Sequence, residues 1–143
     1  MATFVLFDDF GEDLGKAVHD LSTEAISVIL SNTAPNQTTG SVRGDITQIA
    51  SGNGYSTNGQ TLDSITWTET SAGSGVWRLN SADEVFTASG GSIATFRYIV
   101  VCKNSGTFEL IGYLDYGSAV DVTSGNTFTV DLGANGWFEL TIP

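Results

Sequence analysis

The sequence predicts a mainly β protein, a single-domain β-sandwich or jelly-roll-like fold with one short N-terminal amphipathic helix. The clearest signal is the segment 92–122, where a polar turn containing Gly106 joins two long alternating runs. A repeat of two residues is typical of strands, and a short Gly-containing loop between two such runs predicts an antiparallel hairpin. Roughly eight or nine short strands, with a turn signal about every ten residues, complete the pattern of a sandwich.

Length and patterning indicate one domain, residues 1–143, with an N-terminal arm and helix (1–24) followed by strands (25–143). From Phe7 to Leu21 the apolar residues recur at spacings of three and four, which is one face of an amphipathic helix. Acidic residues before Lys16 favour a helix N-terminus in this segment. Besides the hairpin, strands are expected at 25–30, 62–69, 76–80, 84–88, 119–122, 127–132 and 137–142.

Both faces of the 92–122 hairpin are partly apolar. The alternation places Phe96 and Val100 on one face, which we expect to lie on a second sheet. The opposite face then needs its own cover, which either the N-terminal helix or a neighbouring subunit could supply. The apolar residues of this second face are Ile99, Val101, Ile111 and Tyr113.

The charge balance is strongly acidic, since 16 acidic residues against 5 basic ones give a formal charge of −11. Such a charge opposes attraction to nucleic-acid phosphates and to an anionic membrane, so neither is expected as a partner. There is no apolar run of about 18 residues to span a bilayer. Asp8 and Asp9 interrupt the apolar N-terminus, which is unlike a secretory signal. Only 15% of residues are charged, against about 25% in an average domain, which suits a coat or adhesion protein.

Residues that could support catalysis or hold a metal ion are few. His19 is the only histidine and Cys102 the only cysteine, so a nucleophile–base pair and a zinc site both lack residues. Cys102 lies on an apolar strand face and is expected to be a buried hydrophobic residue. We expect no enzymatic activity and no cofactor. The acids of segment 8–13 leave a calcium site open beside the alternative of a solvated helix start, although their spacing differs from an EF-hand.

The aromatic residues offer a choice between core filling and binding. Trp67 and Trp77 alternate in phase with apolar neighbours, which favours the core. Trp137 is out of phase with the apolar face of the last strand, so we expect it to point outward and to serve an interface rather than a sugar site. A sugar-stacking platform of tryptophans and tyrosines stays open as the alternative, with Tyr55, Tyr113 and Tyr116 as its other members.

Several long segments resemble a family of small tailed-bacteriophage proteins that are encoded with virion structural components. They are FGEDLGKAVHDLSTEAISVILSNTAPN, ITQIASGNGYSTNGQTL, VFTASGGSIATFRYIVVCKNS and LIGYLDYGSAVDVTSGNTFTVDLG. The resemblance implies a head decoration (cement) protein or a tail or fibre component. It implies no catalytic residue and no cofactor, in agreement with the composition.

The resulting expectation is a virion protein of the phage head, made in the bacterial host cytoplasm, that binds and stabilises the shell of the major capsid protein. Family analogy implies a homo-oligomer, with a trimer as the expected state. Deleting residues 1–7 is expected to abolish capsid binding without unfolding the sandwich. A receptor- or glycan-binding module of a tail fibre is the alternative. The expected contact residues are Phe4, Val5 and Leu6 of the arm, Ile99, Val101, Ile111 and Tyr113 of the hairpin, and Trp137.

Overall fold

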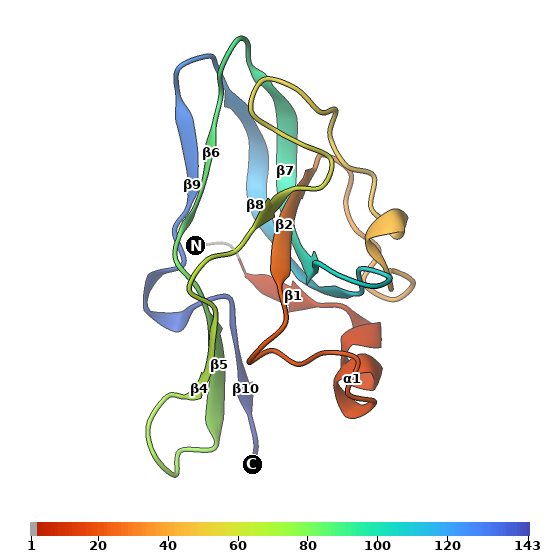
Figure 1. The fold of residues 1–143 in the computed structure, drawn as a ribbon, viewed down its shortest axis with the longest axis vertical. Coiled ribbons are helices and arrows are strands. Elements are labelled where there is room, and N and C mark those ends of the chain that lie inside the picture. Colours follow the sequence, from red (N-terminus) through yellow and green to blue (C-terminus); the bar gives the residue numbers. More distant parts are fainter. Residues whose placement is uncertain (1–2) are drawn as a thin grey trace.

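A computed structural model describes residues 3–143 and has 43% of its residues in strands and 10% in helices. This confirms the mainly β class and is consistent with a single β-sandwich-like domain (Figure 1). The elements are β1 (Phe4–Leu6), α1 (Asp8–Gly15), β2 (Ile26–Ser31), the 3₁₀ helix η1 (Arg43–Asp45), β3 (Gln60–Thr61), β4 (Thr66–Glu69), β5 (Val76–Asn80), β6 (Glu84–Thr87), β7 (Ile93–Lys103), β8 (Leu110–Val122), β9 (Thr127–Val130), the 3₁₀ helix η2 (Gly133–Asn135) and β10 (Phe138–Thr141).

The strands form three antiparallel sheets. A 5-stranded sheet has the order β1-β8-β7-β2-β3, a 3-stranded sheet has the order β10-β5-β4, and β6 pairs with β9 alone. The two smaller sheets lie on one side of the large sheet in Figure 1. Side chains from both layers meet in one core, where Val28, Ile99 and Val101 of the large sheet join Leu79 and Phe86 of the small ones.

The predicted hairpin is formed by β7 and β8, but bulges change which residues share a face. The pairing register shifts between Phe96 and Tyr98 and again between Val101 and Cys102. A bulge inserts an extra residue and so reverses the alternation beyond it. Phe96 therefore lies in the main core with Ile99 and Val101, and the expectation that it shares a face with Val100 is wrong.

The opposite face of the hairpin is covered by the chain itself. Val100, Cys102 and Leu110 pack there against Phe7 and Ile46. The connection between β2 and β3 runs over this face. A backbone hydrogen bond from the N–H of Leu110 to the carbonyl of Ser41, 2.9 Å long, attaches it to β8. The cover is thus a loop with Phe7 beside it, not a helix or a neighbouring subunit.

The helix is shorter than the periodicity predicts. α1 ends at Gly15, and Ala17 has a φ of 59°, a left-handed conformation that a helix cannot contain. Beyond this point the carboxylate of Asp20 accepts hydrogen bonds from Ser22 and Thr23 and stabilises a turn. Leu21 still reaches the core, with 3% exposure, so its spacing reflects burial without a helix.

Tyr55 fastens the polar loop 51–60 to the sandwich. Its hydroxyl accepts a hydrogen bond from the N–H of Leu30 at 3.0 Å and donates one to Oε1 of Gln48 at 2.9 Å. The ring is buried beside Phe86. Tyr55 is therefore structural, and it cannot belong to a sugar-stacking platform on the surface.

We expect Tyr55→Phe to lower the free energy of unfolding by about 1–2 kcal/mol, because the buried N–H of Leu30 loses its acceptor. Burial raises the pKa of Tyr55 from 10.0 to about 12. A raised folded-state pKa adds stability below the unfolded value, and this stability is lost as the pH rises through the folded value. Denaturant unfolding should show the wild type losing this increment between about pH 10 and 12. Tyr116→Phe, at an exposed site, is the control and should change the free energy of unfolding at neutral pH by less than about 0.5 kcal/mol.

Candidate docking surface

The 3-stranded sheet β10-β5-β4 has one polar and one apolar face. Phe138 pairs with Leu79, which pairs with Trp67, and one step along the sheet Leu140 pairs with Trp77. Residues two apart in a strand share a face, so all five side chains lie on the same side. The other side carries Arg78, Glu139, Thr68 and Thr141.

The polar side of this sheet carries an ion pair between Arg78 and Glu139. Nη2 of Arg78 donates to Oε1 of Glu139 at 2.6 Å, and Nε donates to the same oxygen at 2.9 Å. Both side chains remain about one-third exposed, so the pair contributes less than about 1 kcal/mol to stability. This side is a solvated surface.

The apolar side is only partly covered by the rest of the molecule. Leu79 and Phe138 enter the main core, whereas the end near the chain terminus extends past it. Ile142 is 60% exposed there. The uncovered end forms a hollow of about 330 Å³, which we call the tryptophan hollow, lined by Leu14, Trp67, Trp77, Leu140 and Ile142.

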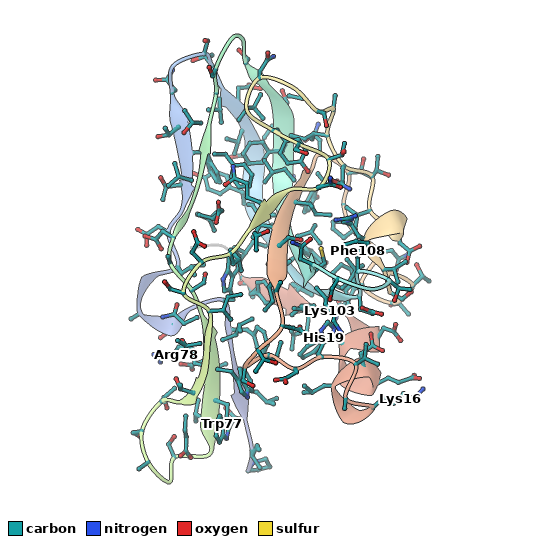
Figure 2. All side chains as sticks on the ribbon, in the orientation of Figure 1. Lys16, His19, Trp77, Arg78, Lys103 and Phe108 are labelled. Atoms are coloured by element: carbon teal, nitrogen blue, oxygen red, sulfur yellow. The ribbon has the colours of Figure 1, made fainter. Side chains whose placement is uncertain are left out.

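The two tryptophans of the hollow form an ordered pair. Their ring centroids are 6.1 Å apart with an interplanar angle of 24°. The carboxylate of Glu69 accepts the N–H groups of Gly73 and Gly75 and so fixes the turn between β4 and β5. Figure 2 shows Trp77 and Arg78 as neighbours on β5, at the end of the molecule that α1 also reaches. The indole pair is thus held on strands rather than on a mobile loop.

All five Lys and Arg side chains lie among the described residues, and each of them has a partner. Lys16, Arg78, Arg97 and Lys103 pair with carboxylates. The guanidinium of Arg43 lies 3.7 Å from the ring centroid of Phe108, a cation–π contact. The formal charge of −11 is therefore carried by a surface with little free positive charge to offset it.

A second, more polar hollow of about 270 Å³ lies between the first turn of α1 and the loop 38–41. Asp8, Asp9 and Glu12 line it, and these are among the acids considered for calcium. Among residues 3–143 there is no group of three or more His, Cys, Asp or Glu side chains arranged to hold a metal ion. Three of the 16 acidic residues therefore lie together beside α1.

Four of the predicted contact residues lie in the interior. Ile99, Val101 and Ile111 are at most 1% exposed, and Trp137 is 3% exposed. Nε1 of Trp137 donates to Oγ of Ser81 at 2.9 Å. The prediction of an outward Trp137 is wrong because Trp137 lies outside β10, which begins at Phe138. Gly136, just before Trp137, has a φ of 62° and turns the chain there. Alternation within the strand does not extend across that turn.

The predicted arm is a strand of the large sheet. Phe4, Val5 and Leu6 form β1, pair with β8 and are half-buried. Tyr113 is also half-buried, with its ring centroid 5.4 Å from that of Phe7. The structure therefore brings none of the predicted residues together as an open surface, and the expectation of a free arm is wrong.

For Trp67 and Trp77 the sequence favoured the core, with a surface platform for sugars as the alternative, and it did not place Leu140 or Ile142 at a surface. Their alternation, Ile65 with Trp67 and Leu140 with Ile142, is that of a buried strand face.

In comparisons with known proteins, no family model, no curated protein and no solved structure matches the chain. Within residues 3–143, the helices are too short or too polar to cross a membrane. A function must therefore be inferred from the residues that the molecule presents at its surface.

Proposed function

We propose that this domain is a structural protein of a phage virion, a decoration protein that docks on the shell of the major capsid protein through the tryptophan hollow. The observation that carries the proposal is the partly open apolar face of β4, β5 and β10, where two half-buried tryptophans, Leu140 and the exposed Ile142 lie together. The resemblance to virion proteins directs the choice of partner. The scarcity of catalytic residue types favours a binding role over an enzyme.

The hollow has the composition of an interaction hot spot. Tryptophan is enriched among residues that dominate binding energy, and each buried aromatic side chain removes about 150–250 Å² from water. Trp77 is already half-buried, so a partner would cover only its remaining exposed area and that of Ile142, which at about 25 cal/mol per Å² supplies a few kcal/mol. Because Trp67 and Trp77 are already stacked, little side-chain entropy is lost when a partner covers them.

The charge of the domain indicates the chemistry of the partner surface. An apolar side chain surrounded by Lys or Arg on the partner would complement the hollow and the negative charge of the chain, and it would speed encounter at low salt. A second copy carries the same −11 and is repelled. We therefore propose that trimers form on the shell, where a basic partner surface offsets the repulsion. Binding to assembled shell alone stabilises the assembly by mass action.

We expect Trp77→Ala to weaken binding to purified phage capsids at least about 30-fold, because loss of a hot-spot aromatic costs about 2 kcal/mol or more. Co-sedimentation across a concentration series measures the change. Val85→Ala is the matched control, because Val85 is an exposed apolar residue on β6, away from the hollow. Equal binding by the two variants would contradict the assignment of the hollow, and failure of the wild type to bind capsids would contradict the decoration role.

A glycan-binding module of a tail fibre is the second candidate, favoured by the stacked pair of Trp67 and Trp77. A pyranose ring packs its apolar face on an exposed indole in the same way as an aliphatic side chain does. A glycan array separates the two functions: saturable binding that Trp77→Ala abolishes, without binding to capsids, would select the glycan role. The buried Trp137 is not a suitable test residue for either role.

A further inference from the structure

The strand β9 has one edge without a partner. Among the described residues β9 pairs only with β6, and Figure 1 shows it as the outermost strand on the left of the molecule. The N–H of Ala88 donates to the carbonyl of Asn126 at 2.9 Å, which makes these two residues a hydrogen-bonded pair. Bonded and non-bonded pairs alternate along an antiparallel ladder, so Thr127 and Thr129 direct their N–H and C=O groups away from β6.

The sequence of β9 does not protect this edge. Edge strands are commonly kept from pairing with other chains by Lys or Pro, by short length or by a covering loop. β3, at one edge of the large sheet, has only 2 residues. β9 has the sequence Thr-Phe-Thr-Val, without charge or proline, and these residue types are all enriched in strands. The chemistry of β9 therefore favours pairing with a further strand.

An apolar hollow opens beside this edge, where β9 faces the large sheet. It has a volume of about 240 Å³, and we call it the β9 hollow. Its lining consists of Ile99, Leu114, Tyr116, Phe128, Thr129, Val130 and Asp131. The ring centroid of Phe128 lies 5.0 Å from that of Phe96 and 5.4 Å from that of Tyr116, which is 51% exposed. A side chain that enters the hollow thus contacts aromatic rings that continue into the main core.

Asp131 gives the β9 hollow its charge. The same residue also lines an adjoining hollow of about 280 Å³, together with Glu139. All five Lys and Arg side chains lie in the described part of the chain, and each of them has a partner elsewhere. The carboxylate of Asp131 accepts the N–H of Gly133 at 3.0 Å but has no basic partner among residues 3–143. A cation supplied by another molecule would complement it.

We propose that the free edge of β9 binds an extended segment of a partner protein, in which apolar residues alternate with Lys or Arg. Main-chain hydrogen bonds to Thr127 and Thr129 add this segment to the sheet as a strand. Phe128 and Val130 pack on the core, whereas the two threonines are exposed. The added strand has the same alternation, so its apolar side chains fill the β9 hollow and its basic side chains lie beside Thr129 and Asp131.

This site is independent of the docking proposed for the tryptophan hollow. The two hollows have no lining residue in common, so a segment bound at β9 leaves the tryptophan pair open. A second copy of the chain is disfavoured as the occupant because it carries the same charge of −11. The β9 site therefore suits a basic strand from a different protein.

Short synthetic peptides test the site by NMR on the full chain, without capsids. A peptide of alternating Val and Lys is the probe, and one of alternating Val and Glu is its control for charge. A Val–Lys peptide with N-methylated backbone amides is the control for main-chain pairing. The Val–Lys peptide should bind saturably and slow hydrogen exchange at the amides of Thr127 and Thr129. The amide of Phe128 already bonds within the β6–β9 ladder and should change little.

Asp131→Asn tests the charge of the site while it keeps an acceptor for the N–H of Gly133. The variant should bind the Val–Lys peptide about threefold more weakly, the effect of losing one exposed ion pair. Asp63→Asn removes the same charge at an exposed position that lines neither hollow, and its binding should equal that of wild type.

Four results would overturn the proposal. They are absence of saturable binding by the Val–Lys peptide, equally tight binding of either control peptide, binding that leaves the amide of Thr129 unprotected, and equal affinities of Asp131→Asn and Asp63→Asn. Protection of the same amides by self-association of the chain, without peptide, would also overturn it, in favour of a second copy as the occupant. Because the assay contains no capsid, its failure is distinct from a failure of the decoration role.

Discussion

Removal of residues 1–7 is expected to lower the free energy of unfolding by more than about 5 kcal/mol, enough to unfold a domain of ordinary stability. β1 lies within this segment and pairs with β8 through Phe4 and Leu6. Phe7 is 2% exposed in the core beneath the loop between β2 and β3. Loss of a buried phenylalanine costs about 3–5 kcal/mol by itself, and loss of the β1 strand adds to it. The earlier expectation that the sandwich survives this deletion is reversed.

A shorter truncation provides the matched control. A chain that begins at Phe4 lacks the exposed Thr3 and residues 1–2, which lie outside the described part, but keeps β1 and Phe7. Urea unfolding should place its midpoint close to that of the full chain. If the chain that begins at Asp8 unfolds with the same midpoint and slope, β1 and Phe7 are not structural.

Strand positions were the most predictable part of the fold. β5 occupies Val76–Asn80 as expected, and β6, β9 and β10 match their predicted ranges to within one or two residues. In these short strands the alternation of apolar residues is undisturbed, and Gly or Asn residues mark their ends. Local chemistry alone determines such boundaries.

The faces of the long hairpin were not predictable from the same pattern. A bulge next to Phe96 places its side chain in the main core with Ile99, and another near Cys102 separates Ile111 from Tyr113. Bulges depend on how two twisted strands fit each other and the layer above them. The alternation of apolar and polar residues within one strand does not show how that strand fits its neighbours.

The candidate site was missed because exposure is a property of the whole fold. Trp67 and Trp77 have the pattern of buried residues, and Trp137 has the pattern of an exposed one, yet the structure buries only Trp137. A strand face is apolar whether a second layer or a partner covers it. Only the three-dimensional arrangement shows that β4, β5 and β10 extend beyond the layer that would cover them (Figure 1).

Phe138→Ala is expected to lower the free energy of unfolding by about 3–5 kcal/mol, because Phe138 joins the hollow to the rest of the molecule. Its ring lies 5.6 Å from Phe4 of β1, 5.7 Å from Phe10 of α1 and 5.9 Å from Trp67 of β4, measured between centroids. Each of these aromatic contacts adds about 0.5–1.5 kcal/mol beyond burial. Truncation at this position therefore loosens the small sheet from both the large sheet and the helix.

The comparison with Ile142→Ala separates support of the hollow from direct contact with a partner. Ile142 lies two residues beyond Leu140 on the same face but is 60% exposed, so its truncation should change the free energy of unfolding by less than about 0.5 kcal/mol. Both variants should bind capsids less tightly, Phe138→Ala because its sheet is displaced and Ile142→Ala because contact area is lost. Denaturant unfolding that finds the two variants equally stable would show that Phe138 does not hold the hollow in place.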